Sequence, residues 1–100
     1  MLTREKVIDK LRKEFAGIKA DFGVKRIAVF GSFAGNTQTR NSDVDIIVEL
    51  EKPLGLKFFD LVDRLEAVLG RRTDILTAEA LKTMRVKQAA DSIRASLLYV

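Results

Sequence analysis

The sequence predicts an α/β (α+β) fold in which a small mixed β-sheet is flanked by helices. Helical and strand-like periodicities alternate along the chain, without internal repeats, in the order α-β-α-β-α-β-α-α. The composition is that of a folded globule, with 47% hydrophobic and 32% charged residues, and 100 residues suit one domain spanning 1–100. The connections are short enough for the first two strands to pair antiparallel, so the sheet need not be all parallel.

The first helix follows Thr3, a residue suited to the N-cap position, and ends before Gly23. Its apolar residues recur at helical spacing, and they are Val7, Ile8, Leu11 and Phe15. A short strand with a buried pattern is expected over residues 24–30, and Gly31 and Ser32 then open a helix. The polar run at residues 36–41 predicts a loop.

The second strand, over residues 43–50, is predicted by strict alternation, because Val44, Ile46, Val48 and Leu50 share one face. After a turn at Pro53 and Gly55, an apolar helix over residues 56–69 is expected to end at Gly70. Its apolar positions exceed a single stripe, which favours contact of part of this helix with another chain. A third strand at residues 73–76, a helix beginning at Ala78 and a helix over about Lys87 to Leu98 complete the prediction.

The absence of cysteine and histidine excludes several kinds of chemistry. Disulfides, thiol nucleophiles, iron–sulfur clusters, the usual zinc sites and the Ser-His-Asp triad all need one or both residues. Catalysis by this chain therefore requires carboxylates, hydroxyls, lysine, arginine and a hard, oxygen-binding cation.

The net charge of +4 is unevenly distributed, because an acidic segment over residues 27–70 lies between two basic ends. A basic balance is compatible with nucleic acid, a membrane surface or an acidic small substrate, and equally with ordinary solubility. No apolar run approaches the roughly 18 residues of a membrane span, and the polar N-terminus does not resemble a signal peptide. We therefore expect a cytoplasmic protein without membrane contact.

Gly31 and Ser32 form the first candidate binding element. A strand that ends in Gly-Ser and opens a helix presents free backbone N–H groups and a hydroxyl, which suit the phosphates of a nucleotide. A simple tight turn is the alternative interpretation of this dipeptide.

Asp43, Asp45 and Asp74 form the second candidate element. Residues two apart on a strand point to the same face, roughly 6.5–7 Å apart, so Asp43 and Asp45 repel each other unless a divalent cation such as magnesium or manganese neutralises them. Asp74 joins them if its strand neighbours the second strand. Three carboxylates around two cations are typical of phosphoryl or nucleotidyl transfer, and Asp74 could also take the proton of an attacking hydroxyl. A solvated acidic strand face and a surface Asp74 are the alternatives.

The combination of Gly31-Ser32, ten intervening residues, Asp43-x-Asp45 and a following Asp74 resembles the nucleotidyltransferase fold of the DNA polymerase beta superfamily. Within that superfamily, the chain is similar to the minimal nucleotidyltransferases of prokaryotes over nearly its whole length. The resemblance extends through residues 42–50, residues 72–77 and the closing residues 97–100.

This resemblance implies a nucleoside triphosphate, ATP or another, held on two Mg²⁺ ions. Gly31 and Ser32 would contact the β- and γ-phosphates, Asp43 and Asp45 would hold both metals, and Asp74 would complete one metal site and activate the acceptor. Many small members of the family are antitoxins of HEPN-domain RNase toxins, and some adenylylate a tyrosine of the toxin. The resemblance therefore implies a protein adenylyltransferase and antitoxin that forms an oligomer with its partner.

The chain departs from the family pattern at Gly35-Asn36, where small members usually carry Arg-Gly. The helix that holds Ser32 is expected to end sooner, and a positive group near the phosphates is missing unless Arg40, Arg71 or Arg72 replaces it. This departure leaves open an alternative, an inactive or catalytically weak antitoxin that neutralises its partner by binding alone. A nucleic-acid-binding domain is a third interpretation, supported only by the net charge, and we expect no direct binding of nucleic acid.

Overall fold

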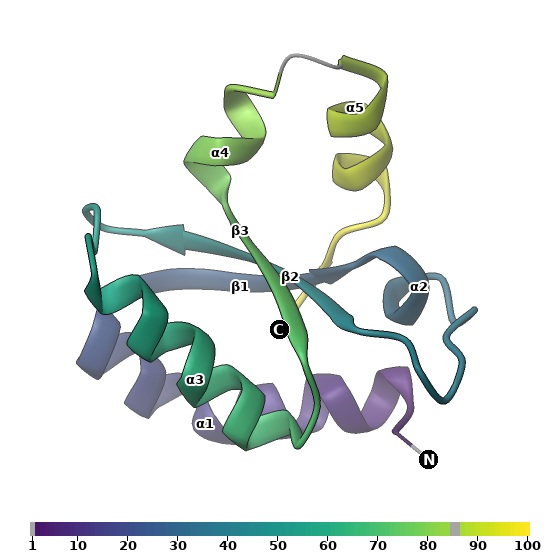
Figure 1. Cartoon of the computed structure of the whole chain (residues 1–100), viewed down its shortest axis with the longest axis horizontal. Coiled ribbons are helices and arrows are strands. Elements are labelled where there is room, and N and C mark those ends of the chain that lie inside the picture. The colour runs from purple at the N-terminus through teal and green to yellow at the C-terminus, as the bar shows by residue number, and fades with distance from the viewer. Residues whose placement is uncertain (1, 85–86) are drawn as a thin grey trace.

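The computed structural model describes residues 2–84 and 87–100, in which one sheet has the strand order β3-β2-β1-β4. β1 (Val24–Phe30) and β2 (Val44–Leu50) are antiparallel. β3 (Thr73–Thr77) runs parallel to β2, and β4 (Leu98–Tyr99) runs antiparallel to β1. The sheet is therefore mixed, as the sequence predicts (Figure 1).

Two helices, α1 (Arg4–Phe22) and α3 (Lys57–Leu69), lie side by side on one face of this sheet (Figure 1). The Thr3 side chain accepts a hydrogen bond from the Lys6 amide and caps α1, while Gly23 and Gly70 end the two helices in the left-handed conformation. Within the described residues, no helix is long and apolar enough to cross a membrane. The core between helices and sheet includes Val7, Leu11, Ile18, Ile27, Val29, Val44, Ile46, Val48, Leu61 and Leu65.

The two faces of β2 have different surroundings. Val44, Ile46 and Val48 are fully buried on the face that α1 and α3 cover. The opposite face carries Asp45 and Ile47, and Ile47 belongs to a second, smaller apolar cluster. That cluster joins the sheet to α4 (Ala78–Lys82) and α5 (Lys87–Ala95). The alternation of β2 thus separates the main core from the face on which the candidate carboxylates lie.

The C-terminal residues differ from the sequence-based prediction. The expected helix over about Lys87 to Leu98 ends at Ala95, and Leu98–Tyr99 forms β4 instead. The edge of β1 that does not pair with β2 pairs with the last residues of the chain instead, through the Ala28–Tyr99 and Val29–Leu98 pairs. The amide of Val100 also donates to the carbonyl of Ile27, at 2.9 Å. Backbone pairing with a distant strand outweighs the helical periodicity of the final apolar residues.

Candidate functional site

Gly31 connects β1 to the short helix α2 (Gly31–Ala34) in a conformation that favours glycine, with φ of +69°. A Cβ atom at this position would overlap the Oδ2 atom of Asp45 and would lie 3.0 Å from its Cγ. Only the absence of a side chain lets the Asp45 carboxylate lie against the start of α2. The structure therefore brings together Gly31 and Asp45, which the sequence predicts as members of two separate candidate elements.

Ser32 lies in the first turn of α2, near the end of the sheet where Phe30 pairs with Asp45. The helix ends early, as Gly35-Asn36 predicts, because Gly35 caps it with a hydrogen bond to the Gly31 carbonyl at 3.0 Å. Asn36 then takes the left-handed conformation, with φ of +57°. Asparagine is among the few residues besides glycine that tolerate this region.

The parallel register of β2 and β3 places Asp45 directly beside Asp74. This pairing satisfies the condition under which Asp74 could join the other two carboxylates. Asp43 lies immediately before β2 and is half-buried, and its Oδ1 atom forms a 3.5 Å ion pair with the Nε atom of Arg72. The structure therefore brings Asp45 and Asp74 together, while Asp43 is turned toward an arginine.

The pKa of the Asp45 carboxyl is raised above its ordinary value. Burial is the largest cause, followed by repulsion from the charges of Asp74 and then of Asp43. Asp43 and Asp74 therefore both act on Asp45 electrostatically. An ionised Asp45 is costly here unless a positive charge is added.

The donor set suits a hard divalent cation, because every candidate ligand is a carboxylate oxygen. In the part of the chain that the structure describes, no three such groups lie close enough together to enclose a metal ion as they stand. Because Asp43 is engaged with the exposed side chain of Arg72, binding of a cation would need Asp43 to turn toward Asp45. An exposed ion pair of this kind is weak, so this rearrangement costs about 1 kcal/mol or less.

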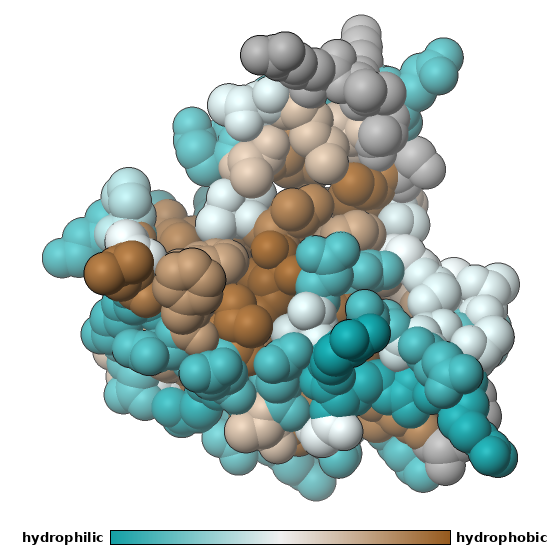
Figure 2. Space-filling view, viewed as in Figure 1, coloured by the Kyte–Doolittle hydropathy of each residue, from teal (hydrophilic) through white to brown (hydrophobic). Residues whose placement is uncertain are grey.

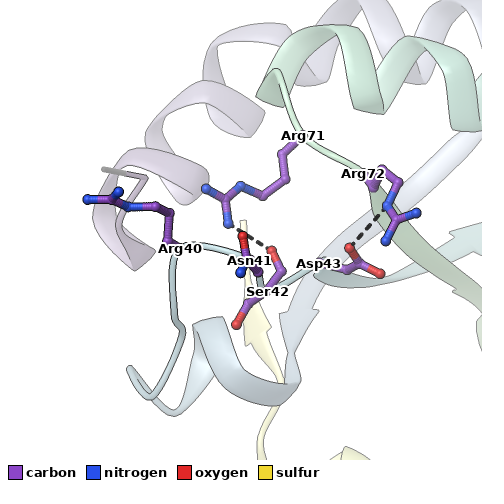
Figure 3. A pocket seen from close by; sticks show the side chains of 6 residues that line it. All are labelled: Arg40, Asn41, Ser42, Asp43, Arg71 and Arg72. Carbon is purple, nitrogen blue, oxygen red and sulfur yellow. Dashed lines mark hydrogen bonds and ion pairs between the residues drawn. The ribbon is translucent and has the colours of Figure 1, made fainter.

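A pocket of about 410 Å³ beside Asp43 contains the three arginines that the sequence offers as replacements for the missing one. Its lining consists of Arg40, Asn41, Ser42, Asp43, Arg71 and Arg72 (Figure 3). The sequence alone did not indicate the different contacts of these arginines. Arg72 is directed to Asp43, whereas Arg71 binds the carbonyl of Ser42 (Figure 3).

An apolar groove of about 890 Å³ lies on the face of β2 that carries Ile47, and Ile47 forms part of its lining. Its apolar lining includes Leu54, Phe58, Leu81, Leu97 and Tyr99. Figure 2 shows hydrophobic side chains gathered in a hollow between α3 below and the helices α4 and α5 above. Near the start of α3, Leu56 and Phe59 leave 84% and 66% of their surface exposed, so apolar surface remains outside the core, as the excess of apolar positions predicts.

The family assignment rests on a match to the nucleotidyltransferase domain model over residues 5–96. The chain belongs to this nucleotidyltransferase family. The match confirms the assignment that the spacing of Gly31-Ser32, Asp43, Asp45 and Asp74 suggests.

Two curated relatives of this nucleotidyltransferase come from archaea. MJ0128 of Methanocaldococcus jannaschii, which carries the name of a protein adenylyltransferase, is 44% identical over 101 residues, covering 100% of both chains. The protein adenylyltransferase MntA of Thermococcus cleftensis is 40% identical over 84 residues, covering 83% of this chain and 85% of its own.

Solved structures share the fold. One described as a minimal nucleotidyltransferase has a TM-score of 0.74 and 24% identity, covering 97% of this chain and 95% of its own. A second is the complex of a tri-AMPylated HEPN toxin of Shewanella oneidensis with its MNT antitoxin, with a TM-score of 0.63 and 15% identity. That match covers 97% of this chain and 71% of the other. The predicted fold, a small mixed sheet flanked by helices, is therefore confirmed.

Proposed function

We propose that this nucleotidyltransferase transfers AMP from ATP to a hydroxyl, a tyrosine in the first instance, of a HEPN-domain partner protein and thereby acts as its antitoxin. The names of the two archaeal relatives support protein adenylylation, and the Shewanella complex supports the kind of partner. One observation of the structure carries the proposal. Gly31 admits the Asp45 carboxylate to the start of α2, so the element proposed to bind phosphate and a carboxylate proposed to bind metal lie in contact.

The phosphate end of ATP is assigned to the start of α2. The backbone N–H groups of Gly31 and Ser32 and the Ser32 hydroxyl would donate hydrogen bonds to the β- and γ-phosphates. Gly31 contributes a second property, because the absence of Cβ lets the backbone approach both a phosphate and Asp45. This assignment fixes which end of the nucleotide lies beside the carboxylates.

The carboxylates would hold Mg²⁺, in two ions, with Asp43 and Asp45 binding both and Asp74 binding one. Bound Mg²⁺ supplies positive charge that neutralises the polyphosphate and favours the ionised form of the acceptor hydroxyl. The pKa of Asp45 is raised by burial and then by repulsion from Asp74 and Asp43, and this supports the assignment because a bound cation would offset both effects.

The chemical step follows from the position of Asp74 beside Asp45. The acceptor oxygen forms a bond with the α-phosphorus of ATP, and the bond from that phosphorus to the oxygen bridging to the β-phosphorus breaks. Asp74 takes the proton of the acceptor hydroxyl, and pyrophosphate leaves with the bridging oxygen. The products are the AMP-modified acceptor and pyrophosphate.

The partner surface is assigned to the exposed apolar residues at the start of α3. Leu56 and Phe59 are both exposed, and the apolar groove lined by Leu54 and Phe58 adjoins them in the chain, so apolar surface available to a partner gathers there. A Phe59→Ser variant should bind the HEPN-domain partner less tightly and bind ATP as the wild type does. Equal partner affinity would place the interface elsewhere.

The proposed function is tested by incubating the chain with Mg²⁺, α-labelled ATP and a candidate HEPN-domain partner. We expect label on the partner, and loss of label when Asp43 and Asp45 are both replaced with asparagine. An Asp9→Asn/Glu14→Gln variant makes the same change in charge at exposed positions of α1, away from the site and from the start of α3, and should retain transfer. If the Asp43→Asn/Asp45→Asn variant transfers no label but still neutralises the partner fully, neutralisation by binding alone is the better account.

A further inference from the structure

The segment between α2 and β2 separates two residues of the proposed site. Ser32 belongs to α2, the helix before the segment, and Asp43 is the last residue of the segment before β2. Residues 36–43 belong to no helix or strand, and their own backbone contacts are few. The amides of Asn36, Thr37 and Ser42 donate to the carbonyls of Phe33, Ser32 and Thr39 at 3.2, 2.8 and 3.2 Å. The Thr39 amide donates to the Ser42 hydroxyl at 2.8 Å. Between Thr37 and Thr39 no backbone bond of this kind joins the two parts of the described segment, so the position of Asp43 relative to Ser32 also depends on contacts from outside it.

Arg71 supplies such contacts from the turn between α3 and β3. Its Nη1 atom donates to the carbonyl of Ser42 at 2.8 Å and, over a longer 3.5 Å, to the carbonyl of Thr39. Ser42 immediately precedes Asp43, so the shorter bond fixes the backbone at the base of that carboxylate. A charged donor makes this hydrogen bond stronger than one between neutral groups.

The same guanidinium also contacts α2, the helix that precedes the segment. It lies over the ring of Phe33, with 5.7 Å from its carbon to the ring centroid. Phe33 is fully buried and follows Ser32 directly in α2. A planar guanidinium can donate in its plane and stack on an aromatic face at the same time, which an ammonium cannot do.

Arg40 provides a comparison within the same pocket. It carries the same charge and is exposed, but among the described residues it makes no hydrogen bond or ion pair with a neighbour. In Figure 3 the Arg71 guanidinium is directed to Ser42, whereas that of Arg40 points away from it. Both arginines therefore place a positive charge near Asp43, but of the two only Arg71 contacts both Ser42 and Phe33.

We propose that Arg71 is a positioning residue for nucleotidyl transfer, one that holds Ser32 and Asp43 in register by binding the backbone just before Asp43 and the helix α2 that carries Ser32. The proposal rests on the proposed function, because it assumes that Ser32 and Asp43 act on the same bound nucleotide. Arg71 touches neither the nucleotide nor the acceptor in this role. It acts through the Ser42 carbonyl and the Phe33 ring.

The test compares Arg71→Ala, Arg71→Lys and the control Arg40→Ala, using the full chain without its partner. The first measurement is the affinity for a non-hydrolysable ATP analogue in the presence of Mg²⁺. Arg71→Ala should weaken it about tenfold or more, Arg71→Lys should weaken it by less, and Arg40→Ala should leave it within about twofold of the wild type. Added guanidinium ion, in tens of millimolar at most, should restore part of the affinity of Arg71→Ala alone.

Hydrogen exchange supplies a readout that does not depend on nucleotide. Amides of residues 37–42 should exchange faster in Arg71→Ala, whereas those of β1 and β2 should keep the wild-type rate. Unchanged exchange and unchanged affinity in Arg71→Ala would overturn the role of Arg71, and an equal loss in Arg40→Ala would reduce it to a general effect of charge. If the wild-type chain itself bound no ATP analogue, the proposed function would fall, and this role with it.

Discussion

Replacing Gly31 with alanine should destabilise the fold by more than a change of conformation alone can explain. Alanine in the left-handed region costs about 1 kcal/mol relative to glycine. At Gly31, where φ is +69°, the added Cβ would also overlap the Asp45 carboxylate and force that side chain or the start of α2 to move. Overpacking of this kind costs about 1–3 kcal/mol. We therefore expect Gly31→Ala to lower the free energy of unfolding by about 2–4 kcal/mol.

Gly70 is a matched control for the conformational part of this cost. Its φ of +65° is nearly the same, and a Cβ atom there would meet nothing within 4 Å. Gly70→Ala should therefore cost only about 1 kcal/mol. Urea unfolding followed by far-UV circular dichroism measures both variants, and the difference between them isolates the contact with Asp45.

A double-mutant cycle assigns that difference to Asp45. When Asp45→Ala removes the carboxylate, Gly31→Ala should lose most of its extra cost and approach the value for Gly70→Ala. The expected coupling is about 1–3 kcal/mol. If Gly31→Ala and Gly70→Ala cost the same, or if the cycle shows no coupling, the close approach of Gly31 to Asp45 is wrong.

Three further outcomes follow from the same structure. The pKa of Asp45 is higher in the folded than in the unfolded chain, so its ionisation costs stability at neutral pH and not below the ordinary value of 3.8. Asp45→Asn should therefore raise the melting temperature at pH 7 and lose this advantage in acid. An unchanged melting temperature at pH 7 would contradict the cost of burying the Asp45 charge and of its repulsion by Asp74 and Asp43. Millimolar Mg²⁺ should stabilise the wild type and not Asp45→Asn, so that the wild type then has the higher melting temperature. Removing Mg²⁺ with a chelator should again leave Asp45→Asn with the higher melting temperature. Asn36→Ala should cost about 1 kcal/mol in urea unfolding because of its φ of +57°, while Asn36→Gly should not destabilise, and equal costs would contradict that backbone conformation.

Local pattern was sufficient to predict most of the elements near the site. The alternation of residues 43–50 identified β2 and assigned Asp45 to the face opposite Val44 and Ile46, because the side-chain period of a strand is two. The glycines at 23 and 70 ended the two long helices as expected. The neighbouring position of the Asp74 strand was only a condition in the sequence, and the parallel pairing of β2 with β3 meets that condition.

What the sequence did not predict depends on contacts between distant segments. The pairing of Tyr99 with Ala28 is set by the free edge of β1, which leaves no periodic signal in two residues. The ion pair of Arg72 with Asp43 and the contacts of Arg71 depend on the register of β3 against β2 and on the turn after Gly70. The sequence could count these arginines near the site, but it could not distinguish their partners.

The central claim, that Asp43 and Asp45 serve nucleotidyl transfer to a protein, is tested most directly by label transfer from α-labelled ATP. With Mg²⁺ and a HEPN-domain partner, the account predicts that the wild type and the Asp9→Asn/Glu14→Gln control label the partner. It predicts that the Asp43→Asn/Asp45→Asn variant, shown to be folded by circular dichroism, does not. Undiminished labelling by that variant would contradict the account.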